Sequence, residues 1–145
     1  MSVRFEPEQL ALAREKLSPE KLEHSLRVGE LAARQGPDYA TVGLLHDMLE
    51  DSDVTLNELR AAGVTDAELA AIQLLTRGEE SYEDYVATVV HSRDRLAISV
   101  KICDLLDHLD PSLSAGLTVE KQAKYLGALP HVLDALRALG DQPNP

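Results

Sequence analysis

Residues 43–52 are Gly-Leu-Leu-His-Asp-Met-Leu-Glu-Asp-Ser, an apolar helical pattern interrupted by four ionisable side chains. At roughly 100° per residue, His46 and Glu50 share one face of such a helix. Asp47 shares a face with both Glu50 and Asp51 by the same spacing. One helical turn is therefore expected to present an imidazole and three carboxylates to nearly one side.

These four groups need a partner if the helix is packed against the rest of the protein. Burying bare charged groups costs on the order of several kcal/mol each. No Lys or Arg lies between Arg34 and Arg60 to neutralise them locally. A divalent metal ion would supply the missing positive charge. The alternative is that the segment is only the acidic, solvent-facing end of a helix.

A second ionisable group lies in the apolar segment 97–109. Most sides of this segment are apolar, which is typical of a buried helix, so Asp104 is expected to point inward. Asp107 and His108 follow about one helical turn later on the same face. Lys101 precedes Asp104 by three residues and could be a purely structural ion-pair partner.

His24 lies on an apolar stripe with Val28 and Leu31. A single histidine on such a stripe is more often a satisfied core residue than a ligand. It becomes a candidate ligand because the pair His46-Asp47 follows on the next predicted helix. The turn at Gly36-Pro37 is short, which makes the two helices antiparallel neighbours.

Composition limits the classes of function. The chain has 145 residues, enough for one domain with a hydrophobic core, and its formal net charge is −11. This charge opposes binding to nucleic acid and to anionic lipid surfaces. A small phosphorylated substrate remains compatible if a cation is supplied locally. The sequence leaves the oligomeric state open.

Cysteine content and hydropathy indicate a cytoplasmic protein. Cys103 is the single cysteine, so there is no disulfide framework, and we expect it to be an inert core residue. Residues 1–10 lack an apolar core of signal-peptide length, and no apolar run approaches about 18 residues.

Helix start and stop signals recur along the whole chain, and scarce aromatic residues with abundant Leu and Ala also favour helix. Capping motifs begin at Ser18, Thr55, Thr65 and Ser81. The sequence therefore predicts an all-α helical bundle of about seven to nine helices in a single domain over residues 1–145, with a disordered tail at 140–145. The predicted helices span about 7–17, 18–35, 38–50, 55–62, 65–76, 81–91, 93–109, 118–128 and 130–139.

The order His24, then His46-Asp47, then Asp104 resembles the H…HD…D signature of the HD-domain phosphohydrolase superfamily. The match covers about residues 18–110. It implies an HD-domain helical bundle in which His24, His46, Asp47 and Asp104 hold one divalent metal. Mixed imidazole and carboxylate ligation suits Mn²⁺ first, with Fe²⁺, Co²⁺, Ni²⁺ and Zn²⁺ also compatible.

Within the superfamily, residues 46–52 and 100–108 resemble the HDxxEDT and VKLADRLHN segments of RelA/SpoT-type (p)ppGpp hydrolases. Two positions depart from that pattern, since Leu105 replaces an Arg and His108 replaces an Asn. The basic strip upstream of the first His also has no counterpart in residues 11–23. Residues 18–32 are instead similar to HD enzymes that split dinucleoside polyphosphates.

We therefore expect a metal-dependent phosphohydrolase that acts on a nucleotide-type phosphoester or pyrophosphate, such as a (p)ppGpp-like alarmone. Glu50 and Asp51 are the expected catalytic residues, which orient and deprotonate water. Lys101, His108 and Arg27 are the expected contacts to substrate phosphate. The alternatives are a nucleoside 5′-monophosphatase, a dinucleoside polyphosphate hydrolase, or a non-catalytic regulatory HD module that binds metal or nucleotide.

Overall fold

A computed structural model describes residues 4–113 and 117–140, which form nine α-helices and one 3-10 turn and contain no strand. This confirms the prediction of an all-α bundle of seven to nine helices. None of the helices in these described residues is long and apolar enough to cross a membrane. The elements are α1 (Pro7–Lys16), α2 (Pro19–Ala32), η1 (Ala33–Gln35), α3 (Pro37–Leu45), α4 (Met48–Asp51), α5 (Leu56–Ala61), α6 (Asp66–Leu74), α7 (Tyr82–His91), α8 (Arg95–Leu109) and α9 (Val119–Gly140).

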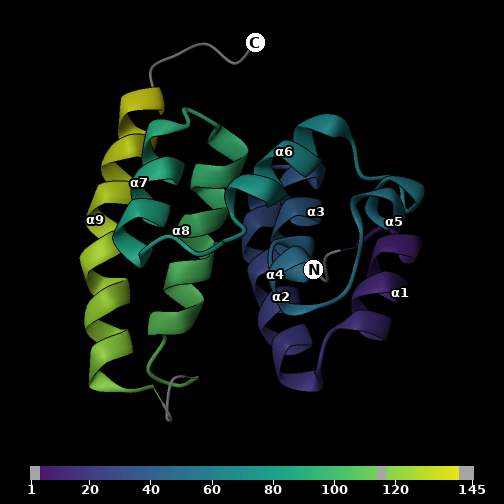
Figure 1. Ribbon diagram of the computed structural model, residues 1–145, viewed down its shortest axis with the longest axis horizontal. Coiled ribbons are helices and arrows are strands. Elements are labelled where there is room, and N and C mark those ends of the chain that lie inside the picture. Colours follow the sequence, from purple (N-terminus) through teal and green to yellow (C-terminus); the bar gives the residue numbers. More distant parts are fainter. Residues whose placement is uncertain (1–3, 114–116, 141–145) are drawn as a thin grey trace.

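The helices form two groups that lie side by side (Figure 1). Helices α7, α8 and α9 make one group, and α1 to α6 make the other. Helix α8 joins them, because it packs against α9 and α7 on its own side and against α2, α3 and α6 on the other. A side chain on α8 can therefore meet residues from both halves of the molecule.

Local capping explains where several helices begin. Thr55 and Thr65 each form the reciprocal capping box that the sequence predicts, with Glu58 and Glu68 respectively. The Ser18 hydroxyl accepts a hydrogen bond from the Lys21 backbone N–H at the start of α2. Each of these contacts satisfies backbone donors that the first helical turn leaves unpaired.

The predicted helix over 38–50 is interrupted, which corrects the sequence analysis. Helix α3 ends at Leu45 and α4 begins at Met48, so His46 and Asp47 lie in the break between them. In an uninterrupted helix two adjacent side chains diverge by roughly 100°. The break lets these neighbours turn toward one point, with His46 Nε2 only 3.2 Å from Asp47 Oδ2.

The two predicted C-terminal helices are in fact one. Helix α9 runs without interruption from Val119 to Gly140 and contains Pro130 in its interior. A proline inside a helix removes one backbone hydrogen bond and usually marks a boundary. Here Ala128 and Val132 on either side of it are both buried, so packing holds the two halves together. Gly140 belongs to the helix, and residues 141–145 of the predicted tail lie outside the described residues.

Two glycines set the separation of α2 and α3. A Cβ atom placed on Gly43 would lie 2.8 Å from the Cα of Gly29, closer than side-chain atoms pack. The backbones of the two helices therefore approach as closely as glycine permits. This contact fixes how His24 of α2 faces the His46-Asp47 break. Below it, the core is filled by fully buried side chains that include Leu44, Leu45, Met48, Leu59, Ile72, Ile98 and Leu105.

Candidate metal centre

Four side chains from distant parts of the chain converge on one point. They are His24 of α2, His46 and Asp47 of the break, and Asp104 of α8, and each offers one ligand atom within 4.8 Å of the others. Asp104 Oδ1 lies 2.9 Å from Nε2 of His24 and 3.2 Å from Nε2 of His46. Asp47 Oδ2 is 3.7 Å from His24 Nε2. The structure thus brings together all four residues that the sequence analysis selected as ligands.

The far nitrogen of each imidazole is held by an acceptor. Nδ1 of His46 donates to the carbonyl oxygen of Gly43 at 2.7 Å, since a carbonyl can only accept. Nδ1 of His24 faces Oδ2 of Asp107 at 2.6 Å. Arg27 donates a hydrogen bond to the same carboxylate, from its Nε to Oδ1 at 2.8 Å. These partners direct both Nε2 atoms into the cluster, the orientation found in histidines that bind metals.

The donor set fits a divalent cation. Ligand atoms about 2.1 Å from one ion and at right angles to each other are about 3 Å apart. The four N···O separations within the cluster run from 2.9 to 3.7 Å. Two imidazole nitrogens that face two carboxylates in a buried place require a positive charge between them, either protons on the rings or a shared metal ion.

The pKa shifts reflect this demand for positive charge. Burial alone would lower the pKa of His46, but the carboxylates of Asp47 and Asp104 raise it well above its usual value. Burial likewise opposes ionisation of Asp104, yet Lys101 and the surrounding imidazoles hold its pKa well below the usual range. The acidic groups are therefore ionised at neutral pH, which is the form that binds a cation.

Lys101 and His108 both contact Asp104. The buried Lys101 ammonium lies 2.9 Å from Asp104 Oδ2, the oxygen that faces away from the two imidazoles. His108 Nε2 is 3.3 Å from Oδ1, and its ring stacks on His24 with centroids 4.5 Å apart. Both residues line the cavity over the cluster, where a substrate phosphate could reach them.

Glu50 and Asp51 lie at the edge of the same cavity. Glu50 Oε1 accepts a hydrogen bond from the Arg77 backbone N–H at 2.7 Å. Asp51 forms an ion pair with Lys21 at 2.9 Å. Arg27 does not line the cavity, because it is turned toward Asp107 behind His24. Its place in the structure is that of a residue which orients a ligand, whereas the sequence analysis expected a substrate contact.

The cavity over the cluster measures about 430 Å³, and both acidic and basic side chains line it. Five of the 14 Lys and Arg residues of the chain line it. These five positive charges match in number the carboxylates that also line the cavity, so the lining carries no excess of negative charge in a protein with a net charge of −11. The five are Lys21, Arg77, Lys101, Lys121 and Lys124.

Sequence reasoning missed the contribution of α9. Lys121, Lys124 and Tyr125 line the cavity although they lie beyond the 18–110 region that the sequence analysis assigned to the site. The ring of Tyr125 stacks on His108 with centroids 4.5 Å apart and planes 13° apart. No motif marks these residues. Only the packing of α9 against α8 brings them to the cluster.

No protein-family model and no curated protein matches the sequence.

Proposed function

We propose that this protein is a metal-dependent phosphohydrolase of the HD-domain type that acts on a nucleotide-type phosphoester or pyrophosphate. The observation that carries the proposal is the convergence of two oriented imidazoles and two carboxylates at a cavity that five Lys and Arg side chains also line. The resemblance of His24, His46-Asp47 and Asp104 to the H…HD…D signature supports the same function. Alarmones and dinucleoside polyphosphates both belong to this class of substrate.

The four clustered residues would hold one divalent metal, with Mn²⁺ as the best match to mixed imidazole and carboxylate ligands. Such an ion makes water more acidic and polarises a phosphoryl oxygen. Asp107 and the Gly43 carbonyl oxygen keep the two imidazoles oriented toward it. Lys101 and the other basic residues that line the cavity would bind and neutralise the phosphate oxygens.

Glu50 is the better candidate for the general base. Burial, together with Asp47 and Asp51, raises its pKa against the opposing hydrogen bond from the Arg77 backbone. A raised pKa makes a carboxylate a stronger proton acceptor. Asp51 is instead neutralised by Lys21, which also lines the cavity.

The decisive experiment replaces a ligand. Purified protein should bind about one Mn²⁺ per chain, and Asp47→Ala should lose both the metal and hydrolysis. Asp53→Ala is the matched control, because Asp53 is an exposed surface residue whose carboxylate pairs with Lys16. Metal binding without turnover of ppGpp, diadenosine tetraphosphate, NADPH or simple nucleotides would identify a regulatory module and overturn the proposal.

A second variant tests the base. Glu50→Gln should keep Mn²⁺ binding and lower kcat by about 10²- to 10⁴-fold, because only proton transfer is removed. In the unmodified protein, turnover should rise with pH through the raised pKa of Glu50, since the base must be deprotonated, and the variant should lose that dependence. The exposed Glu30→Gln serves as control. A normal kcat in Glu50→Gln would exclude this role.

A further inference from the structure

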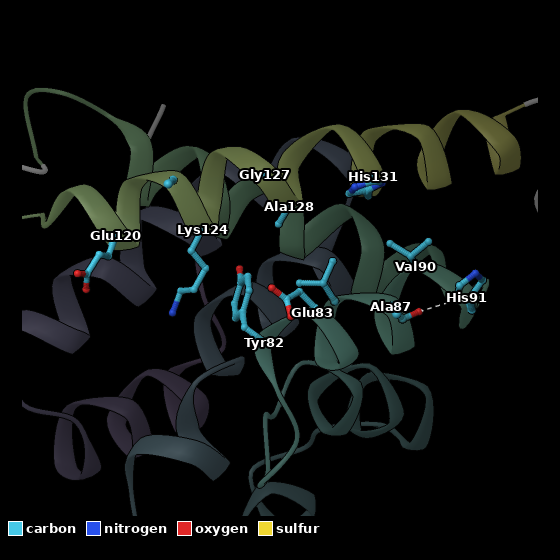
Figure 2. A pocket seen from close by; sticks show the side chains of 12 residues that line it. Tyr82, Glu83, Ala87, Val90, His91, Glu120, Lys124, Gly127, Ala128 and His131 are labelled. Atoms are coloured by element: carbon cyan, nitrogen blue, oxygen red, sulfur yellow. Dashed lines mark hydrogen bonds between the residues drawn. The ribbon is translucent and has the colours of Figure 1, made fainter.

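A second cavity lies beside the metal centre, in a groove between α7 and α9 (Figure 2). It measures about 800 Å³. Half of its twelve lining residues are small or apolar, among them Val86 and Val90 of α7 and Ala123 and Ala128 of α9. Gly127 widens it, because a Cβ added there would meet no atom within 4 Å. The groove therefore has room for a flat group between the two helices.

The groove is continuous with the cavity over the cluster. Tyr82 and Lys124 line both of them, and Figure 2 shows the Lys124 side chain reaching down from α9 beside the Tyr82 ring. The Lys124 ammonium is 4.5 Å from the centroid of that ring. These two residues therefore lie where the two cavities meet, a point called here the Tyr82–Lys124 junction.

A row of rings links the ligands to the groove. His24 stacks on His108, and His108 stacks on Tyr125, each pair with centroids 4.5 Å apart. Tyr125 in turn meets the edge of Tyr82 at 6.1 Å. In this row the His108 ring lies between those of His24 and Tyr125, so the rings form a packed aromatic wall that leads from the cluster to the groove.

The junction is also cationic. Burial, together with the nearby positive charges of Arg77 and Lys121, lowers the pKa of Lys124. The Arg77 guanidinium lies 5.7 Å from the centre of the Tyr82 ring. Several positive charges gathered around one tyrosine favour an anionic group at this point, between the cluster and the groove.

We propose that the groove between α7 and α9 holds the organic part of the substrate, a planar heterocycle such as a nucleobase, while the linked phosphates cross the Tyr82–Lys124 junction to the metal centre. This inference rests on the proposed function, which places a phosphate at the cluster. The substrate class is then a nucleotide with at least two linked phosphates, one at the ligands and one beside Lys124.

The polar groups of the groove favour a heterocycle over an acyl chain. Glu83, His91 and His131 line it among the apolar residues. Nδ1 of His91 already bonds to the Ala87 carbonyl oxygen, so Nε2 is the ring's other polar atom. All three side chains are solvent-exposed, so a purely apolar occupant would displace water from them without replacing its hydrogen bonds, whereas a base offers donors and acceptors along its edge.

The test fills the groove without straining the fold. Gly127→Leu places a side chain in open space within the groove. Gly140→Leu is the matched control, because a Cβ there also meets nothing within 4 Å. Gly140 lies outside the groove, at the end of the same helix. Binding of ADP and of inorganic pyrophosphate, which share a diphosphate, is measured by calorimetry in Mn²⁺ with product release followed in parallel.

Gly127→Leu should weaken ADP binding on the order of tenfold to a hundredfold, the contribution expected of one stacked base, and leave pyrophosphate binding unchanged. Gly140→Leu should change neither. Two results would refute the groove assignment and leave the proposed function standing, provided that pyrophosphate still binds in a Mn²⁺-dependent way. One is equal ADP affinity in Gly127→Leu and the unmodified protein. The other is ADP that binds no more tightly than pyrophosphate. Pyrophosphate binding that ignores both Mn²⁺ and Asp47→Ala would instead refute the proposed function.

Discussion

At the scale of single residues, Asp107 does more than its sequence context suggests. It lies one turn beyond Asp104, and its two oxygens are divided between the imidazole of His24 and the guanidinium of Arg27. Burial would raise its pKa, but Arg27 and His24 lower it, so the group is an acceptor at neutral pH. His24 is thereby fixed as a ring whose Nε2 faces the cluster.

Asp107→Asn should therefore weaken Mn²⁺ binding by about 10- to 100-fold, the usual effect of removing the partner of a ligating histidine. The amide can still fill the space, so the free energy of unfolding of the metal-free protein should change far less than the metal affinity. Titration against a chelator measures the affinity, and the exposed Asp134→Asn is the control. Unchanged affinity in Asp107→Asn would mean that His24 needs no such orientation.

At the scale of elements, the contact between α2 and α3 is the most sensitive feature. Gly43→Ala would place a Cβ 2.8 Å from the Gly29 backbone, which has no side chain that could move away. The helices must separate, at a cost of about 1–3 kcal/mol for overpacking. Because His24 lies on α2 and His46 directly follows the end of α3, Mn²⁺ affinity should fall with stability.

Urea unfolding and Mn²⁺ titration check this prediction. Gly127→Ala is the matched control, since its Cβ meets open space and the change should stabilise α9 by about 0.5–1 kcal/mol. If Gly43→Ala keeps full stability and full metal affinity, the close approach of α2 and α3 is not what positions the two imidazoles.

The same scale shows what the sequence could and could not predict. The capping boxes at Thr55 and Thr65 are local hydrogen-bond patterns, so their helices were predicted with correct starts. The break at His46 and Asp47 is invisible locally, because the flanking residues are good helix formers. At Pro130 the sequence predicted a helix boundary that the structure does not have. Tertiary packing of α9 outweighs the hydrogen bond that the proline removes.

At the scale of the whole molecule, the four clustered residues could be predicted from the sequence, but the part of the cavity lining that α9 supplies could not. His24, His46, Asp47 and Asp104 carry an ordered pattern of residue types in the sequence, and the fold brings them within 4.8 Å. Lys124 and Tyr125 carry no pattern, and they reach the cavity only because α9 returns alongside α8 (Figure 1). The contributions of a distant helix depend on the packing of the complete bundle.

Metal binding should also stabilise the whole fold, because the cluster exists only when α2, the break and α8 are assembled. An ion that binds the folded chain alone adds stability by mass action, about 2.7 kcal/mol when its free concentration is roughly 100 times Kd. It also relieves the repulsion between the Asp47 and Asp104 carboxylates, which no longer need protonated imidazoles between them. Thermal unfolding with increasing Mn²⁺ should thus show a rising Tm in the unmodified protein and a flat response in Asp47→Ala. A Tm that rises equally in both proteins would mean that the stabilising ion binds elsewhere on this acidic chain. A flat response in both would mean that the four clustered residues do not bind Mn²⁺.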